Sequence, residues 1–418
     1  MCPGARIITD EIELALSLEN RYKILNENIF PMLGKNEQDF LREVQQFCLD
    51  LEPKIDWDKD VYVLFPELGK RGFIQRLNLW RDFGPSGMFY ENLLSLGIGF
   101  MDPELELSRT ASGILCGNPT FRHGGTAALN KVQDDLMSGV KVGCIGITEP
   151  NRGSDSVNME TTCEKLQDGS VRYNGTKVFT TNGAKADYFA AYAVYDKKNP
   201  RGTMVQAMFK RESGVHTERL HIQSVPRVHI SKTIYKDATT PADMILGDNG
   251  QGYKNLFEGL VPERLMINGS ALTICWNSLV HGIIYGNLRK QFGQNLLNMQ
   301  GIGFPMGQLL AEVSACTALE VHVARQYDQH IMGKKPDPAI EKSVAALTAQ
   351  AKYLITHQAH KTAYEVQQHM GGISVTDNTR MDQLAKVSDI QEVIGGHRNV
   401  MLLLIQNQIR KQADLLKK

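Results

Sequence analysis

The sequence lacks an excess of either charge, since 46 Lys and Arg residues balance 46 Asp and Glu residues over 418 positions. This balance gives no positive field that would attract nucleic acid, so we expect no nucleic-acid partner. A CxxC pair is also missing, because the seven cysteines are scattered. That spacing argues against a disulfide framework and against a thiolate zinc site. We therefore expect a reducing compartment.

Long apolar runs are missing too. No stretch approaches ~18 consecutive apolar residues, so we expect no membrane span. The N-terminal segment carries Asp10, Glu11 and Glu13 early and has no long apolar core, unlike a signal or transit peptide. A cytoplasmic location is the resulting expectation. His357 and His360 stand three residues apart, but no nearby carboxylate or cysteine completes a ligand set, so we predict no metal site.

The texture of the sequence changes twice along the chain. Its length exceeds the ~250 to 300 residues at which single cores stop growing, so we expect several packed units. Residues 1–36 form an N-terminal extension, 37–141 a helical domain, 142–250 a β-sheet domain, and 251–418 a helical domain. The fold class is thus predicted as α+β.

Helical periodicity supports the first and last of these domains. Phe40, Val44, Phe47 and Leu51 share one face of a predicted helix that Pro53 closes. The C-terminal domain contains four candidate helices, over 263–291, 303–332, 338–370 and 389–417. Between the two helical parts, short β-prone runs alternate with turn signals.

Two segments of the β-sheet region could hold a cofactor. One reads ITEPNRGSD from Ile147, and the other reads GTKVFTTNG from Gly175. Alternation along a strand predicts Lys177, Phe179 and Thr181 on one side, which places an aromatic wall beside a hydroxyl donor. These groups suit the polar edge and apolar face of a flavin. Two hairpin strands with ordinary turns are the alternative interpretation of the same residues.

Together with two later motifs, these segments resemble the acyl-CoA dehydrogenase family. The later motifs are YGNLRKQFG from Tyr285, followed by Gln300, and QHMGG from Gln368, in family order. The resemblance covers roughly 37–418, and the 80–122 region matches poorly. It implies an acyl-CoA dehydrogenase-like fold, with a barrel-like middle β-sheet domain and a C-terminal four-helix bundle. It also implies a homotetramer with FAD bound between subunits. It also implies FAD contacts at Ile147, Thr148, Gly153, Ser154, Phe179, Thr181, Arg289, Phe292, Gln300, Gln368 and Gly372, with Phe179 in place of a tryptophan.

The family's reaction removes the α-proton of an acyl-CoA thioester with a carboxylate while hydride leaves the β-carbon for the flavin. Counting from Gly372, the loop that usually carries this glutamate falls at Gly395, so the usual base is missing. Glycine retains an N–H, and we expect Gly395 to donate it to the thioester carbonyl.

A replacement base is available in GLVPER from Gly259, which resembles the segment that carries the base in isovaleryl-type members. This puts the base at Glu263, whose pKa we expect burial against substrate to raise. Pro262 suits a first helical turn, so a helix-dipole role is the alternative for Glu263. Asp389 and Glu392 are rival bases.

The resemblance leaves other roles open. Ser154, Arg264 and Gly396 are expected to contact substrate, and His397 and Arg398 to touch either substrate or nucleotide. The 80–122 region is expected to shape the acyl pocket. Electrons are expected to pass to an electron-transfer flavoprotein. An oxidase, a flavin-site lyase and a catalytically inactive FAD-binding structural subunit are the alternatives.

Overall fold

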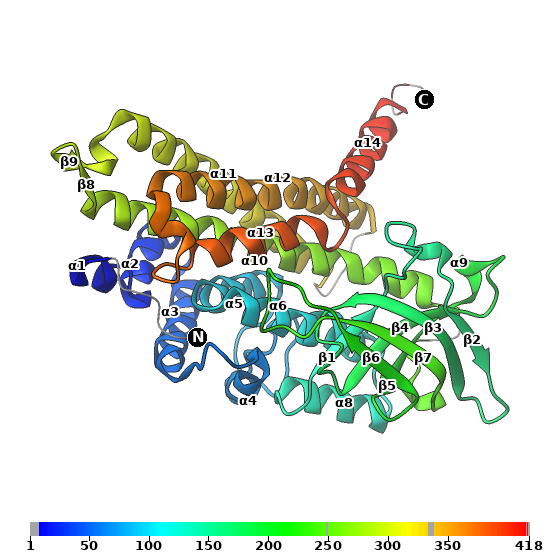
Figure 1. The fold of residues 1–418 in the computed structure, drawn as a ribbon. Helices are drawn as coiled ribbons and strands as arrows, with labels where there is room; N and C mark the ends of the chain where they lie inside the picture. Colours follow the sequence, from blue (N-terminus) through cyan, green and yellow to red (C-terminus); the bar gives the residue numbers. More distant parts are fainter. Residues whose placement is uncertain (1–7, 248–249, 333–337, 415, 417–418) are drawn as a thin grey trace. The chain divides into compact units, whose positions relative to one another are not determined.

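The computed structural model describes residues 8–247, 250–332, 338–414 and 416 (Figure 1). These residues form two compact units. The first combines 1–58, 88–106 and 264–418, and the second combines 59–87 and 107–263. We describe each unit separately and call them the helical unit and the sheet unit.

The sheet unit contains one seven-stranded sheet, drawn in green in Figure 1. Its strand order is β1-β4-β2-β3-β7-β6, and β5 pairs with β4. The β1 strand runs parallel to β4, whereas β3, β7 and β6 pair antiparallel. The strands are β1 (Gly143–Gly146), β2 (Thr162–Lys165), β3 (Val171–Thr180), β4 (Tyr188–Val194), β5 (Met204–Lys210), β6 (Val215–Arg219) and β7 (Ser231–Thr240). The short β-prone runs of the sequence contain six of these strands, all except β2.

Both faces of the β5 strand are buried. Val205, Ala207 and Phe209 pack into one apolar cluster with β3 and β7, while Met204 packs into a second cluster with Tyr192. Alternate residues of a strand point to opposite faces, which explains the division. The second cluster also contains Leu256 of the helix that follows the sheet. This helix therefore covers the face of the sheet opposite to the first cluster.

One prediction about β3 is wrong. Lys177, Phe179 and Thr181 do not share a side, because a register shift between Lys177 and Thr180 interrupts the pairing with β7. Phe179 has φ +55°, and the strand ends at Thr180. Lys177 is fully buried, whereas the Phe179 side chain is 66% exposed. A bulge of this kind turns side chains to new directions that alternation alone does not predict.

Helices complete the sheet unit. They are α4 (Phe65–Lys70), a π-helix over Ala111–Gly117, α7 (Asn118–His123) and α8 (Ala127–Met137), and the start of α10 (Gly252–Leu288). The π-helix packs against β1. Such helices are rare and occur often at functional sites.

The α10 helix corrects the prediction that a helix begins near Glu263. It begins at Gly252, and Pro262 lies inside it rather than in its first turn. Helix-dipole effects fall off within the first turn, so the dipole role considered for Glu263 has no basis in this position.

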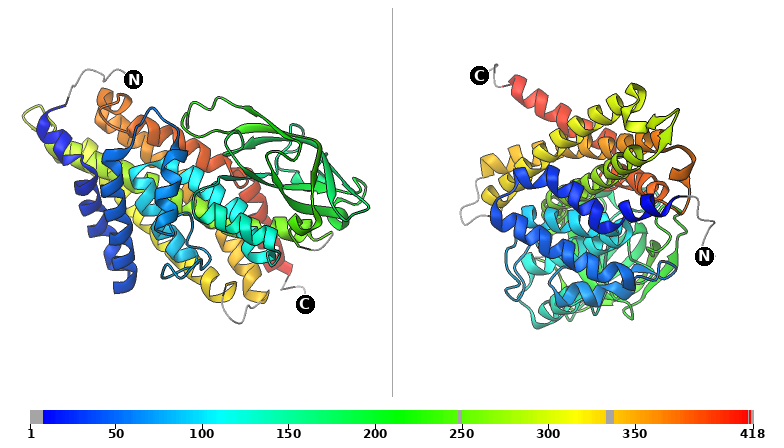
Figure 2. Two further views of the ribbon diagram at one scale, coloured as in Figure 1. Left: turned by 90° about the horizontal axis from the view of Figure 1, so that it is seen from below. Right: turned by 90° about the vertical axis from the view of Figure 1, so that its left-hand side faces the viewer.

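The helical unit contains most of the other helices. They are α1 (Asp10–Ala15), α2 (Leu18–Ile29), α3 (Lys35–Leu51), α5 (Met88–Met101), most of α10, α11 (Gln300–His330), α12 (Pro338–Met370), α13 (Met381–Val393) and α14 (Arg398–Asp414). The α11 and α12 helices lie side by side in Figures 1 and 2. In α3, Phe40, Val44 and Leu51 are buried as predicted. Phe47 is only half-buried, and Cys48 lies on the buried face instead.

The predicted helix over 389–417 is two helices. The α13 helix ends at Val393 and α14 starts at Arg398. Gly395 and Gly396 between them have φ +64° and +98°, which are left-handed values that a right-handed helix cannot contain. The same glycines that marked the missing loop glutamate therefore interrupt the helix.

Part of the predicted N-terminal extension packs into the helical unit. Arg21 is buried and donates to Asn277 Oδ1 (2.7 Å) and to the Phe100 carbonyl (3.2 Å). The Tyr22 hydroxyl donates to the Gly97 carbonyl (2.8 Å). These bonds tie α2 to α5 and α10, so residues from Leu18 onward belong to the core.

A buried carboxyl lies deep in the helical unit. Glu320 of α11 is 2% exposed and accepts hydrogen bonds from the side-chain amides of Asn92 and Asn268, each at 2.7 Å. Burial raises its pKa to about 8, and the two amide bonds only partly oppose that shift.

Three expectations drawn from absences can be compared with the described residues. Judged by length and composition alone, one helix among the described residues, α11, is apolar enough to cross a membrane. In the most apolar 18-residue stretch of α11, 22% is buried. No group of three or more potential metal ligands occurs in the described part of the chain. Six cysteines in that part are free thiols.

Candidate active site

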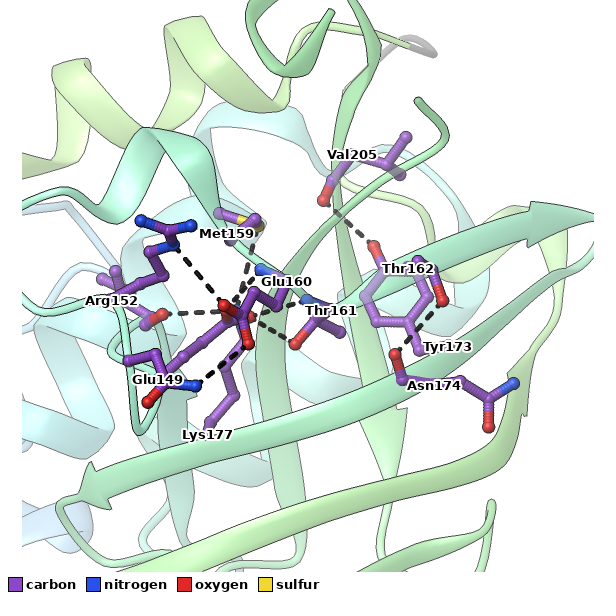
Figure 3. A network of polar contacts seen from close by, with 12 residues as sticks. Glu149, Arg152, Met159, Glu160, Thr161, Thr162, Tyr173, Asn174, Lys177 and Val205 are labelled. Atoms are coloured by element: carbon purple, nitrogen blue, oxygen red, sulfur yellow. Dashed lines mark hydrogen bonds and ion pairs between the residues drawn. The ribbon is translucent and has the colours of Figure 1, made fainter. Parts of the chain in front are cut away.

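A buried ion pair organises the first motif of the sheet unit (Figure 3). Lys177 Nζ lies 2.8 Å from Glu149 Oε1, and the two side chains are 0% and 2% exposed. Glu149 also accepts from the backbone N–H groups of Glu160 and Thr161 and from the Thr161 hydroxyl. Lys177 donates further to the Ile147 carbonyl at 3.2 Å. The pair therefore clamps the ITEP segment to β3.

The titration of this pair reflects competing effects. Burial by itself raises the pKa of Glu149, but the charge of Lys177 and the hydrogen bonds from its neighbours together lower that pKa below 4.5. Burial lowers the pKa of Lys177, and the attraction of Glu149 opposes this shift. A carboxylate with several donors around it remains ionised, so the clamp operates as an ion pair at neutral pH.

The clamp brings the two sequence motifs together. The Val178 N–H donates to the Thr148 carbonyl at 2.8 Å, so Thr148 lies next to the β3 bulge. Phe179, one residue further, exposes its ring. Thr148 and Thr181 are half-buried. An exposed aromatic ring beside threonine hydroxyls offers the apolar face and hydrogen-bonding edge that a flavin requires.

The end of the first motif is open to solvent. Gly153 and Ser154 are exposed, and a Cβ placed on Gly153 would meet no atom within 4 Å. The turn before them is closed by paired backbone bonds between Glu149 and Arg152. Exposed backbone and a hydroxyl in this turn fit an anionic group such as a pyrophosphate.

Asn182 of the second motif has a structural role that the sequence did not indicate. Its side chain donates to the Ser108 and Gly143 carbonyls, at 2.8 and 3.1 Å. It also accepts from the hydroxyls of Ser108 (2.6 Å) and Tyr62 (3.0 Å). Asn182 is fully buried with φ +68°, so it fixes the turn after Thr181.

Glu263 lines a small cavity within the sheet unit. The walls come from four elements: the start of α10, β1 with the residues after it, the π-helix with α7, and the paired strands β4 and β5. The lining residues are Ile114, Leu115, Asn118, Pro119, Arg122, His123, Ile145, Ile147, Tyr192, Gln206, Asn255, Leu256, Gly259 and Glu263.

The cavity joins several sequence predictions. Ile147 of the first motif lines it, as does the 114–122 part of the poorly matching region. Burial raises the pKa of Tyr192, and the nearby negative charge of Glu263 raises it further. The Glu263 carboxylate therefore lies near Tyr192 of β4, and both residues line the same cavity.

The two rival bases are paired with histidines. His360 Nδ1 lies 2.9 Å from Asp389 Oδ1, and His357 Nδ1 lies 3.9 Å from Glu392 Oε1. These contacts connect α12 to α13 in the helical unit. Both carboxylates thus have partners between helices, and neither lines the cavity that contains Glu263.

The glycine loop of the helical unit is held by two buried cations. Arg264 Nε donates to the Gly395 carbonyl at 3.1 Å, and Lys352 Nζ donates to the Gly396 carbonyl at 2.7 Å. Arg264 directly follows Glu263 in α10. The structure therefore brings together Arg264 and Gly395, two residues that the sequence connected only through the family resemblance.

The residues expected near the adenosine half of FAD all lie at exposed positions of the helical unit. Arg289 and Phe292 belong to the short β8 (Lys290–Gln291) and β9 (Gln294–Asn295) hairpin region, and the Phe292 side chain is 94% exposed. Gln300 starts α11, while Gln368 and Gly372 flank the end of α12. His397 and Arg398 are exposed next to the glycine loop.

Tyr192, Gln206 and Asn255 are among the cavity residues that the sequence did not indicate. Gln206 had a signal, because it is the single polar residue inside the apolar run MVQAMF. A polar residue that interrupts a buried strand usually has a specific partner. Tyr192 had no comparable signal, since it lies in the uniformly apolar run YFAAYAV. Asn255 had none either, since its neighbours are ordinary amphipathic sequence.

Comparison with known proteins gives consistent results. Residues 144–237 match the family model described as "Acyl-CoA dehydrogenase, middle domain", and residues 250–410 match "Acyl-CoA dehydrogenase, C-terminal domain". A short-chain acyl-CoA dehydrogenase from Megasphaera elsdenii is 30% identical over 284 residues, which is 66% of this chain and 73% of the relative. The bovine mitochondrial isovaleryl-CoA dehydrogenase is 28% identical, covering 78% of this chain and 77% of its own length.

Solved structures agree on the fold. The butyryl-CoA dehydrogenase of Megasphaera elsdenii superposes with a TM-score of 0.81 at 24% identity, covering 90% of this chain and 98% of that one. A glutaryl-coenzyme A dehydrogenase complex superposes with a TM-score of 0.82 at 21% identity, with 92% and 96% coverage. The α+β fold predicted from the sequence is confirmed by these superpositions.

Proposed function

Since this chain belongs to the acyl-CoA dehydrogenase family, we propose that it binds FAD and oxidises an acyl-CoA thioester to the 2-enoyl thioester. Glu263 is the proposed base. Its carboxylate takes the proton from the α-carbon, while the β-carbon loses a hydride. FAD supplies the hydride acceptor when it is bound.

The position of Glu263 is the observation that carries this proposal. A general base must lie within reach of the proton that it removes, in a space that admits the substrate. Glu263 lines a cavity together with Ile147, which directly precedes Thr148 of the first motif. Asp389 and Glu392 do not line this cavity.

Carbonyl activation is proposed for the glycine loop. The developing enolate needs a donor at the thioester oxygen, and the Gly395 N–H can provide it. Arg264 fixes this peptide by its bond to the Gly395 carbonyl. Gly396, Arg264 and Ser154 are proposed to contact substrate, with Arg264 acting mainly as a positioning residue.

FAD fits the residues that the structure presents. Thr148 and Thr181 would hydrogen-bond the flavin, and the exposed Phe179 ring would cover its face. The open turn at Gly153 and Ser154 would hold the pyrophosphate. Five exposed residues of the helical unit would bind the adenosine half in a homotetramer: Arg289, Phe292, Gln300, Gln368 and Gly372.

Flavin bleaching tests the proposal. FAD-loaded protein should lose absorbance near the flavin's visible maximum when mixed anaerobically with a panel of straight, branched and cyclic acyl-CoA thioesters. Glu263→Gln should slow bleaching at least about 100-fold, because it removes a general base and preserves the side-chain shape. FAD content should be unchanged.

Asp389→Asn and Glu392→Gln are the matched controls. Each removes a carboxylate of the helical unit while keeping its shape, and each should bleach within about twofold of the parent, as surface changes usually do. A fast Glu263→Gln variant together with a slow Glu392→Gln variant would transfer the base assignment to α13. No bleaching with any thioester would support an inactive FAD-binding subunit.

The electron acceptor requires a separate measurement. We propose an electron-transfer flavoprotein as acceptor and cytoplasm as the location. Hydrogen peroxide formed stoichiometrically with product under air would identify an oxidase instead. Light scattering of the FAD-loaded protein should give the mass of four chains of 46.7 kDa each.

A further inference from the structure

Two buried amides line the cavity that contains Glu263. Gln206 of β5 and Asn255 of α10 are 1% and 4% exposed. Asn255 Nδ2 donates to the Leu246 carbonyl (2.8 Å) and to Gln206 Oε1 (3.2 Å). Both protons of the Asn255 amide are therefore used.

These bonds determine which way each amide faces. The Leu246 carbonyl can only accept, so Asn255 must present its nitrogen there. Gln206 must then present its oxygen to the second proton. Among the described residues, neither Asn255 Oδ1 nor Gln206 Nε2, both buried, makes a hydrogen bond of standard geometry. Gln206 is nonetheless close enough to the Tyr192 hydroxyl to lower the pKa of that group. A buried polar atom without a partner costs free energy unless a ligand satisfies it.

The two unpartnered atoms specify the chemistry of a ligand group. Asn255 Oδ1 requires a donor, and Gln206 Nε2 requires an acceptor. A carboxylate would place negative charge against Asn255 Oδ1, and an ammonium group would have no acceptor for Gln206 Nε2. Only an uncharged group with both functions, such as a hydroxyl or a carboxamide, satisfies both atoms.

The amide pair lies well away from the proposed base. Asn255 and Glu263 are eight residues apart in α10, which corresponds to about 12 Å along the helix axis. A two- or three-carbon acyl group at Glu263 would not reach that far. The carrier arm of a thioester must lead out to solvent, whereas Gln206 and Asn255 are among the most buried residues of the cavity wall.

We propose that the substrate is a medium-length thioester whose acyl chain ends in a hydroxyl or carboxamide group, bound by Gln206 and Asn255. This rests on the proposed function for the position of the thioester. The pair selects the substrate and takes no part in proton or hydride transfer.

Calorimetric binding to the FAD-loaded protein tests the proposal. The probes are ω-hydroxyoctanoyl-CoA and nonanoyl-CoA, which have equal size and differ only in hydroxyl against methyl. The parent should bind the hydroxyl probe at least about tenfold more tightly, because the methyl leaves both amide atoms unsatisfied. The half-thioester of octanedioic acid, with its terminal carboxylate, should bind no better than nonanoyl-CoA.

Gln206→Met keeps the length of the side chain and removes the donor, so it should reduce the preference to about twofold or less. Gln46→Met, the same change on the exposed face of α3, should keep the parent's preference. Tyr192 is the cross-strand partner of Gln206, so Tyr192→Phe completes the set.

Three results would overturn the inference. They are equal affinities of the parent for the two probes, an equal loss of affinity for both probes in Gln206→Met, and a Tyr192→Phe variant that alone abolishes the preference. The second result would assign the pair to the carrier arm. Flavin bleaching recorded in parallel reports on the proposed function independently, since binding preference does not require turnover.

Discussion

Removal of Lys177 should destabilise the protein far more than removal of an exposed lysine. In Lys177→Met the Glu149 carboxylate would remain 2% exposed. It would lose its contact with Lys177 Nζ, at 2.8 Å from Glu149 Oε1, which is its only contact with a cation among the described residues. Breaking one side of a buried ion pair costs about 3 to 5 kcal/mol, because the remaining charge has no compensation. Two backbone N–H groups and one hydroxyl still reach Glu149, so we expect the lower half of that range.

Urea unfolding followed by circular dichroism measures this loss. Lys232→Met is the matched control, since Lys232 pairs with Glu218 at 3.1 Å but the two side chains are 37% and 61% exposed. Exposed pairs contribute about 0 to 1 kcal/mol, so the control should hardly change the free energy of unfolding.

A double variant separates charge from packing. Glu149→Gln combined with Lys177→Met removes both charges and should recover more than half of the stability lost in Lys177→Met. A loss below about 1 kcal/mol in Lys177→Met, or no recovery in the double variant, would refute the view that an ion pair clamps the two motifs.

Four further predictions follow from other contacts. The lowered pKa of Glu149 means that its contribution is complete above pH 4.5 and disappears as the pH falls below that value, which acid-dependent urea titrations would detect. The pKa of Glu320 is raised to about 8, so the free energy of unfolding should fall as the pH rises from 4.5 to 8, at up to about 1.4 kcal/mol per pH unit. Glu320→Gln should abolish this pH dependence, and an unchanged slope in the variant would contradict the assignment. Asn182→Ala removes four hydrogen bonds and should lower the free energy of unfolding by at least about 2 kcal/mol. Gly396→Ala should cost about 1 to 2 kcal/mol in the same titration, because φ is +98° and the new Cβ would lie 2.9 Å from Met401 Cε.

Local patterns in the sequence carried much of the fold. Every β-prone run became a strand, and the helix over α3 has its predicted face except at Phe47. These features depend on residues close together in the chain, whose periodicity a sequence displays directly. The helix boundaries at Pro262 and Gly395 were wrong. Proline occurs inside α10 because tertiary packing overrides local propensity. The two left-handed glycines between α13 and α14 were a local signal for a break that the predicted helix did not take into account.

The site itself divides in the same way. The sequence alone determined the two motifs, the missing loop glutamate and the candidacy of Glu263, since each is a matter of residue identity at a given spacing. Only the tertiary structure decided that Lys177 is buried beneath the first motif while Phe179 is exposed, because a bulge resets side-chain direction. The structure alone also put Gln206 and Glu263 on one cavity, since strand register and helix docking bring together residues far apart in the chain.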